Sequence, residues 1–413
     1  MRAHLACVLG WSACAVLGCG GSPSPSGADG STPTPDAQVA LDGGTPPAPY
    51  YDTTRWGPRF ADMILETWPD ARDISAGSGF QYNNGIVLHG IERIYEKTGD
   101  PRYLAYIRAF VDAYVGADGS IPLPAEHDVD RIEPAILLPF LYEETGDARY
   151  LTASRNFRGA YDAFPLNSEG GYWHKERYPN EMWLDSIYMT GPFLTRYGSV
   201  SDCGAFCFDT PAFQAMLLAS HAQSATTGLL VHGWDGDRNA SWADPATGLA
   251  PIAWDRATGW YAMALVDMLD DLPQTHPSRA EVLRVLRALA EGIRDTQDPE
   301  TGLWHQVIDQ GARADNWIET SGSAILIYAI KKAVDRGYIP GGFLDVAVRG
   351  WEGLKAVIES ATGTGSPRSD GAVQGMGIQN DYANYVNKPR LTNSSHGLCG
   401  VLMAASQMER YEP

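Results

Sequence analysis

Tyr95-Glu-Lys-Thr-Gly-Asp-Pro-Arg-Tyr103 returns 47 residues later as Tyr142-Glu-Glu-Thr-Gly-Asp-Ala-Arg-Tyr150. A repeat of this length has room for two helices and their turns, which predicts a series of helical hairpins. In the first copy Gly99 suits the end of one helix, Asp100 suits the start of the next, and Pro101 suits its first turn. The second copy carries the same glycine and aspartate, so both helix ends are signalled twice.

Two kinds of helical pattern alternate along the chain. One is amphipathic, as over 103–114, and is typical of a covering helix; the other is apolar nearly all round, as over 135–142, and is typical of an interior helix. We predict covering helices near 55–68, 101–115, 147–163, 209–223, 277–294 and 342–359. We predict interior helices near 84–97, 131–144, 183–197, 257–272, 318–333 and 396–409.

Six such pairs predict an all-α fold, an (α/α)6 barrel of six helical hairpins over residues 50–413. No comparable run of strands with a period of two appears, which argues against a division of this region into two domains. An open helical solenoid gives the same local pattern and is the alternative.

The first 49 residues predict an envelope protein. Arg2 and the apolar stretch 5–17 form a signal peptide over 1–18 that is too short to span a bilayer. Val16-Leu-Gly-Cys19 resembles a lipobox, which predicts lipidation of Cys19; an ordinary signal peptide is the alternative. Residues 19–49, rich in Gly, Ser, Pro and Thr, predict a disordered tether. We expect a lipid-anchored bacterial protein whose only membrane contact is the anchor, and Gly20 favours the outer over the inner membrane.

Charge and cysteine usage exclude other classes. A net charge of -19 argues against nucleic-acid binding and requires local cations for any anionic ligand. Outside the signal peptide and Cys19 the cysteines are Cys203, Cys207 and Cys399. The first two suit a small local loop closed by a disulfide, the third a buried thiol, and none has the further ligands of a structural zinc site. We predict a monomer without metal or cofactor.

Side chains that could take part in catalysis or ligand binding lie at the N-terminal ends of the predicted interior helices. In the segment 172–193, His174, Trp183 and Asp185 stand together. An acid beside a large ring loses hydration, which raises its pKa, as a proton donor near neutral pH requires. The other interior helices contribute Tyr82, His127, Asp130, His232, Arg256, Trp260, Trp304, His305, Glu319 and His396. A closed ring gathers such residues at one mouth, where helix N-termini favour an anion.

With these residues in order, the chain resembles glycoside hydrolase family 105, the unsaturated rhamnogalacturonyl hydrolases, and the related family 88 unsaturated glucuronyl hydrolases. The resemblance spans roughly residues 55–410. It depends on the segment 172–193 and on Gln81-Tyr-Asn-Asn-Gly85, Val129-Asp-Arg-Ile-Glu-Pro-Ala135, Leu230-Val-His-Gly-Trp-Asp235, Trp254-Asp-Arg-Ala-Thr-Gly-Trp-Tyr261, Gly302-Leu-Trp-His305 and Glu319-Thr-Ser321.

The resemblance implies an (α/α)6 barrel that hydrates a vinyl ether in an oligosaccharide. Asp185 matches the general acid and base, which protonates C4 of a 4,5-unsaturated uronic acid and then helps water add at C5. Asp130 matches the second essential aspartate, and a second carboxylate nearby raises the pKa of Asp185 further. Matched positions around the sugar are Tyr82, His174, Trp183, His232, Arg256 and Trp260, with Arg256 as partner of the sugar carboxylate. The implied substrate is unsaturated galacturonyl-rhamnose from pectin.

Departures from the family pattern are Phe80, Ala135, Asp255 and Thr258. A carboxylate at Asp255 would weaken the grip of Arg256 on an anion. Several alternatives stay open: Asp130 as a helix cap with Asp128 in its place, Arg256 as a neutraliser of Asp255, and the histidines as core residues. Competing functions are a conventional inverting glycosidase or a sugar epimerase on the same barrel, and a non-catalytic carbohydrate-binding lipoprotein.

Overall fold

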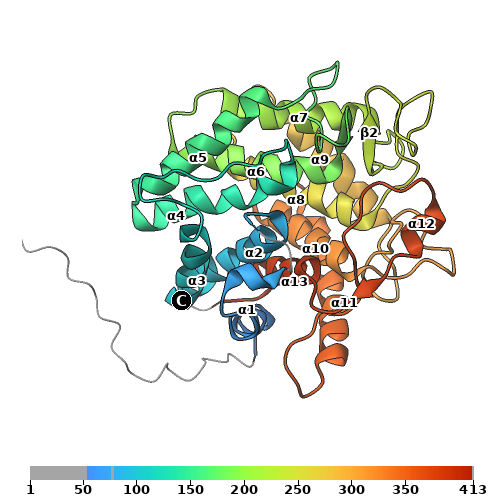
Figure 1. The fold of residues 1–413 in the computed structure, drawn as a ribbon. Helices are drawn as coiled ribbons and strands as arrows, with labels where there is room; N and C mark the ends of the chain where they lie inside the picture. The colour runs from blue at the N-terminus through green and yellow to red at the C-terminus, as the bar shows by residue number, and fades with distance from the viewer. Residues whose placement is uncertain (1–53, 76–78, 412–413) are drawn as a thin grey trace, which may run out of the picture. The chain divides into compact units, whose positions relative to one another are not determined.

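A computed structural model describes residues 54–75 and 79–411, and this part of the chain is a barrel of paired helices (Figure 1). The inner helices are α2 (Tyr82–Thr98), α4 (Leu137–Thr145), α6 (Leu184–Val200), α8 (Asp255–Asp271), α10 (Thr320–Asp335) and α13 (Ser395–Met408). The outer helices are α1 (Trp56–Thr67), α3 (Pro101–Asp112), α5 (Ala148–Ala160), α7 (Phe206–Ala222), α9 (Arg279–Asp295) and α11 (Leu344–Thr362). The signal peptide, the tether and Cys19 lie outside the described residues.

The inner helices form a closed ring. Each packs against the next in the chain, and α13 packs against both α10 and α2, which completes the circle. Figure 1 shows α13, at the red end of the colour scale, beside the blue α2. The predicted (α/α)6 barrel is therefore confirmed, and an open solenoid, whose first and last repeats do not meet, is excluded.

The repeated Thr-Gly-Asp element ends one helix and starts the next as predicted. Gly99 adopts a left-handed conformation with φ 63°, which a residue with a side chain rarely takes, and ends α2. The side chain of Asp100 accepts a hydrogen bond from the backbone N–H of Arg102, and Pro101 opens α3. Asp147 caps α5 in the same way.

Burial follows the two helical patterns. In α8 every residue from Asp255 to Leu269 is buried, whereas α9 buries one stripe that includes Val282, Leu286 and Ile293. Each fully buried aliphatic side chain of this size contributes about 1.5–3 kcal/mol of transfer free energy. The ring of inner helices is thus held by apolar packing on all sides, and the outer helices shield it from water.

The second inner helix begins later than predicted. The prediction placed it over 131–144, but α4 starts at Leu137, after the 3-10 turns η2 (Val129–Arg131) and η3 (Glu133–Ile136). Pro134 lies in the second turn and has no N–H to donate into an α-helical ladder. Asp130 consequently lies in a tight turn at the mouth of the barrel.

Two short antiparallel sheets join the loops at this mouth. Strand β1 (Glu181–Trp183) pairs with β2 (Gly233–Asp235), and β3 (Ala372–Val373) pairs with β4 (Arg390–Leu391). Strand β1 leads directly into α6, so the first sheet fixes the approach to Asp185. A five-residue helix, α12 (Tyr382–Val386), lies between β3 and β4.

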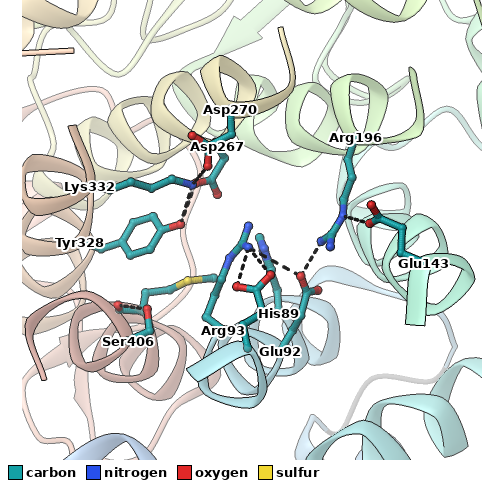
Figure 2. Close-up of polar contacts among 12 residues, drawn as sticks. His89, Glu92, Arg93, Glu143, Arg196, Asp267, Asp270, Tyr328, Lys332 and Ser406 are labelled. Atoms are coloured by element: carbon teal, nitrogen blue, oxygen red, sulfur yellow. Dashed lines mark hydrogen bonds and ion pairs between the residues drawn. The ribbon is translucent and has the colours of Figure 1, made fainter. Parts of the chain in front are cut away.

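The opposite end of the barrel, where the inner helices end, is closed by ion pairs (Figure 2). Lys332 of α10 contacts Asp267 of α8 at 2.6 Å and Asp270 at 2.8 Å. Arg196 of α6 contacts Glu92 of α2 at 2.5 Å and Glu143 of α4 at 3.2 Å. These pairs connect five inner helices, and the hydroxyl of Tyr328 donates a further hydrogen bond to Asp267. We call these residues the far-end network.

The first and last described helices are connected at their ends. The carboxylate of Glu409 accepts hydrogen bonds from the backbone N–H groups of Trp56, at 2.5 Å, and Gly57, at 3.0 Å. These are donors of the first turn of α1, which have no acceptor within their own helix. A side chain 352 residues away along the chain therefore caps the first helix.

Cys203 and Cys207 form a disulfide just before and within α7, while Cys399 is a buried free thiol. Within the described residues, no helix has both the length and the apolar character that crossing a bilayer requires.

Candidate active site

A cavity of about 210 Å³ opens at the N-terminal ends of the inner helices. It is lined by Tyr82, Asp130, His174, Lys175, Arg177, Tyr178, Trp183, Asp185, Met189, Trp254, Arg256, Trp260, Gly375, Met376, Gly377 and His396. The lining comes from five inner helices or the turns that precede them, and from the segment after β3. The mouth of the barrel therefore gathers the predicted residues, as a closed ring requires.

Asp185 lies in the first turn of α6 and is 8% exposed. One carboxylate oxygen, Oδ2, is 3.2 Å from Nε2 of the buried His232. Burial favours the neutral acid, but the hydrogen bond with His232 outweighs it and lowers the pKa of Asp185. The expectation of a raised pKa for Asp185 is wrong, because sequence proximity to Trp183 did not reveal the imidazole on the other side.

His232 does not line the cavity. It is fully buried behind Asp185, and its Nδ1 lies 2.7 Å from the hydroxyl of Tyr385 in α12. The expected contact of His232 with a sugar is therefore replaced by a contact with Asp185. Tyr385 was missed because 153 residues separate it from His232, and no local pattern connects the two.

Asp130 is the second carboxylate of the cavity. The neighbouring Asp128 accepts the hydrogen bond from the Asp130 backbone N–H and caps the turn η2, which leaves the Asp130 side chain free to face the cavity. Lys175 Nζ contacts both carboxylates and lies 3.2 Å from Asp128. Burial raises the pKa of Asp130 although Lys175 opposes the shift. The cap alternative for Asp130 is thereby excluded.

His174 and Trp183 form a stacked pair, with ring centroids 3.9 Å apart and planes at 15°. Nδ1 of His174 lies 2.9 Å from the hydroxyl of Ser186, and burial lowers the pKa of His174 to about 3, so the ring is neutral. The Trp183 indole donates to Glu181 at 2.8 Å. A Cβ at Gly377 would lie 2.6 Å from the same indole, so only glycine fits there.

Arg256 is 1% exposed and holds the segment after β3. Nη1 donates to Ser321 and to the carbonyl of Val373, at 3.1 and 2.6 Å, and Nη2 donates to the carbonyl of Gln374 at 2.9 Å. Within the described part of the chain, Nε of Arg256 is buried and has no hydrogen-bond partner. A buried donor without an acceptor is costly, and a bound anion would satisfy it.

Asp255 is fully buried next to Arg256 at the start of α8. Its carboxyl oxygens have no hydrogen-bond partner among the described residues, and burial together with the nearby Glu319 raises its pKa well above the ordinary value. The direction of this shift disfavours the ionised form of Asp255 and so argues against both expectations that assigned it a negative charge beside Arg256.

Comparison with known proteins identifies the family of this chain. The family model described as Glycosyl Hydrolase Family 88 matches residues 56–412. The chain belongs to this family. The resemblance stated from the sequence is confirmed, and the protein is an enzyme, a glycoside hydrolase.

Three relatives of this Family 88 member give the range of similarity. Protein Atu3128 of Agrobacterium fabrum is 34% identical over 52% of the chain and 96% of its own length. The unsaturated rhamnogalacturonyl hydrolase YesR of Bacillus subtilis is 28% identical over 61% of the chain and 70% of its own length. The structure of a family 105 glycoside hydrolase from C. acetobutylicum is 30% identical, has a TM-score of 0.78, and covers 86% of this chain and 99% of its own.

The Family 88 site includes aromatic walls that the sequence indicated. Tyr82 and His396 face each other with ring centroids 5.7 Å apart, and burial raises the pKa of Tyr82. Trp260 lines the cavity but is 1% exposed and stacks on Tyr188 at 4.9 Å, so much of its surface packs against the core.

Other residues of the predicted mouth lie elsewhere in this Family 88 fold. His127 is outside the cavity and contacts Glu176, and Glu319 caps α10 through Ser321 and Gly322. Lys175 and Arg177 were not predicted, although both lie inside the segment that was singled out. Within residues 54–75 and 79–411, no group of three His, Cys, Asp or Glu side chains is placed to hold a metal ion.

Proposed function

We propose that this Family 88 member removes a 4,5-unsaturated uronic acid from the non-reducing end of short oligosaccharides, with unsaturated galacturonyl-rhamnose as its substrate. One observation carries the proposal: the buried Asp185 and the half-buried Asp130, whose pKa values are shifted in opposite directions, line one small cavity together with Arg256, whose buried Nε–H has no partner among the described residues. The volume is below that of typical drug-sized sites, which suits a single terminal sugar. The name of the Bacillus subtilis relative supports the choice of rhamnose.

The reaction is hydration of the C4=C5 vinyl ether. The Asp185 carboxyl gives its proton to C4, and the positive charge at C5 is shared with the ring oxygen. A water oxygen then bonds to C5 while its proton passes to the Asp185 carboxylate, which restores the acid. The product is a hemiketal at C5. It opens by breaking the bond from C5 to the ring oxygen, which leaves a ketone at C5 and a hemiacetal at C1, and the hemiacetal then releases the neighbouring sugar as a free alcohol and becomes an aldehyde. Asp130 and Lys175 hold the sugar and the water from the opposite wall.

The lowered pKa of Asp185 leaves it ionised in the free enzyme at neutral pH. A uronate in the same cavity adds a second negative charge and excludes water, and both effects raise the pKa of Asp185. Substrate binding is therefore coupled to proton uptake. The pH profile of kcat, which reports the complex, is expected to fall at a higher pH than the profile of kcat/KM, which reports the free enzyme.

Arg256 is the proposed partner of the uronate carboxylate. Nε–H has no acceptor in the described part of the chain, and Nη2 carries a second N–H besides the one donated to Gln374. Two such N–H groups on one guanidinium match the two oxygens of a carboxylate. We assign sugar contacts also to Tyr82, His174 and Trp183 in the cavity lining.

The decisive experiment incubates the purified protein with unsaturated galacturonyl-rhamnose in heavy water. Hydration removes the ultraviolet absorbance of the double bond and places one solvent deuterium at C4 before rhamnose is released, whereas direct cleavage of the glycosidic bond releases rhamnose while the double bond is still present. Saturated galacturonyl-rhamnose is the control and is expected to stay intact. Release of rhamnose with the double bond retained, or cleavage of the saturated disaccharide, would contradict the proposal.

Anchoring of this activity to the envelope is a separate proposal, supported by the lipobox-like Val16-Leu-Gly-Cys19 and the composition of residues 19–49. Labelling of cells with a radioactive fatty acid is expected to mark the full chain and not the Cys19→Ala variant. Equal labelling of both would exclude this anchor, and the activity assay would be unaffected.

A further inference from the structure

Tyr385 connects the segment that lines the cavity to the acid of the active site. It lies in α12, its side chain is fully buried, and its hydroxyl is 2.7 Å from Nδ1 of His232. Nε2 of the same imidazole is 3.2 Å from Asp185. The three side chains form one chain of hydrogen bonds from α12 to the first turn of α6.

The one hydrogen of the Tyr385 phenol indicates the direction of these bonds. The backbone N–H of Gln379 donates to the Tyr385 oxygen at 3.3 Å, and the phenol itself has one hydrogen to donate. The hydroxyl is buried, and the acceptor that lies within reach of it is Nδ1 of His232. With the phenol hydrogen directed at Nδ1, the N–H of the imidazole is on Nε2, which lies beside Asp185.

We infer that Tyr385 is a positioning residue for the reaction: it fixes the tautomer of His232 so that an N–H of the imidazole is always directed at Asp185. Without the phenol, Nδ1 and Nε2 compete for the proton. The Nδ1–H tautomer presents a lone pair to the Asp185 carboxylate instead of a donor. That arrangement repels the ionised acid and turns its carboxyl group away from the orientation that the donor sets.

The surroundings hold Tyr385 in place without its hydroxyl. The side-chain N–H of Gln306 donates to the backbone carbonyl of Tyr385 at 3.0 Å, and the side-chain oxygen of Gln306 accepts from the Trp254 indole at 3.0 Å. Both Gln306 and Trp254 are buried. The ring therefore keeps its socket in a Tyr385→Phe variant, which removes the hydroxyl and little else.

The same helix offers a matched control. The hydroxyl of Tyr382 donates to Asp315 at 2.9 Å, and Tyr382 is not among the residues that line the cavity. Tyr382→Phe also removes one phenol hydroxyl from α12, but this hydroxyl faces away from His232. A general weakening of α12 would affect both variants alike.

Two readouts test the inference, and the first needs no substrate. In 15N spectra of histidine-labelled enzyme, His232 is expected to show a protonated Nε2 in the wild type and in Tyr382→Phe, and a mixture of tautomers in Tyr385→Phe. A pure Nε2–H signal that is unchanged in Tyr385→Phe would overturn the inference. This result stands whether or not the proposed substrate is correct.

The second readout is kinetic and depends on the proposed function. Tyr385→Phe is expected to lower kcat about ten- to a hundredfold, in the range seen when a group that orients an active-site histidine is lost, with KM changed less than threefold. The fall of kcat/KM with pH should move to higher pH, because Asp185 loses a fixed donor. The charged and titratable groups that also face Asp185 are His174, Asp130, Arg256 and Tyr82, and they are the same in both variants.

A double-mutant cycle separates the tautomer from other effects. In a His232→Ala background, Tyr385→Phe should cost no further activity, since no tautomer remains to be fixed. An equal loss in both backgrounds would overturn the inference and place the effect of Tyr385 in the cavity-lining segment. Inactivity of the wild type on the unsaturated disaccharide would remove the proposed function and leave the spectroscopic test intact.

Discussion

The two ends of the barrel use buried charge in opposite ways, although the same inner helices build both. At the far-end network each buried lysine or arginine contacts a carboxylate of a neighbouring helix, as Lys332 does with Asp267 and Arg196 with Glu92 (Figure 2). At the mouth, the partner of Asp185 is an imidazole, and Nε of Arg256 has no hydrogen-bond partner among the described residues.

This difference teaches which charges serve the fold and which serve the reaction. Helix C-terminal ends carry partial negative charge, which favours cations, and the far-end network places Lys332 and Arg196 there between acids. A network of this kind fixes the register of the helices. At the mouth, Asp185, Asp130 and Arg256 line a cavity instead, where a ligand can reach them, as functional sites commonly allow.

The largest effect is expected from the mouth. Asp185→Asn keeps the size of the side chain and its acceptor for His232 but removes the transferable proton. We expect kcat/KM to fall about 10²- to 10⁴-fold, the range of general acid and base catalysis, with little change in stability. The loss of ultraviolet absorbance and the melting temperature measure the two quantities; a large drop in melting temperature would place Asp185 with the structural charges instead.

Breaking the far end should show the reverse. Lys332→Met leaves the buried Asp267 without its cation, which is expected to cost about 3–5 kcal/mol in the free energy of unfolding. The activity of the protein that remains folded should stay within twofold. Urea unfolding checks the first part. The neighbouring Lys331, which pairs with Asp335 of its own helix at a more exposed site, is the control, and Lys331→Met should cost less than about 1 kcal/mol.

An intermediate effect is expected from Glu181, which holds the Trp183 indole at the mouth. Burial raises the pKa of Glu181 to about 6, so its contribution to stability is fully present below the ordinary glutamate pKa and is lost as the pH rises through about 6. Glu181→Gln should remove this pH dependence and gain about 1 kcal/mol at pH 8. Thermal unfolding between pH 4.5 and 8 measures it; parallel curves for both proteins would contradict the assignment.

The smallest effect is expected at the exposed rim of the far end. Arg336 contacts Asp270 at 2.9 Å, but its side chain is 57% exposed. Arg336→Ala should cost only about 0.2–1 kcal/mol, and less at high salt, because water and ions screen such a pair. An effect as large as that of Lys332→Met, in the same urea experiment, would show that the network acts as one unit.

The fold was predictable because its determinants are local. Gly99 and Asp100 specify helix ends through their own backbone and side chain, and the apolar pattern of α8 specifies burial on all sides. The start of α4 was placed too early, since the periodic pattern continues through Pro134 although the backbone hydrogen bonds do not.

In the candidate site, the sequence could predict only those contacts that join residues close together along the chain. The cluster of His174, Trp183 and Asp185 could be located, and the cavity contains it. The direction of the pKa shift of Asp185 could not be predicted, because it depends on His232, which is 47 residues away along the chain. Tyr385, which contacts His232, lies further still. The raised pKa of Asp255 was missed for the same reason, since Glu319 approaches it only after the ring has closed.

The cap that Glu409 supplies to α1 has a consequence for synthesis. A ribosome releases Trp56 and Gly57 long before their acceptor exists, and α2 likewise emerges without the α13 surface that covers it. Contacts this distant along the chain are slow to form. The nascent barrel therefore remains an open arc with an uncovered apolar seam until its last helix leaves the exit tunnel, and that interval is when a chaperone would engage it.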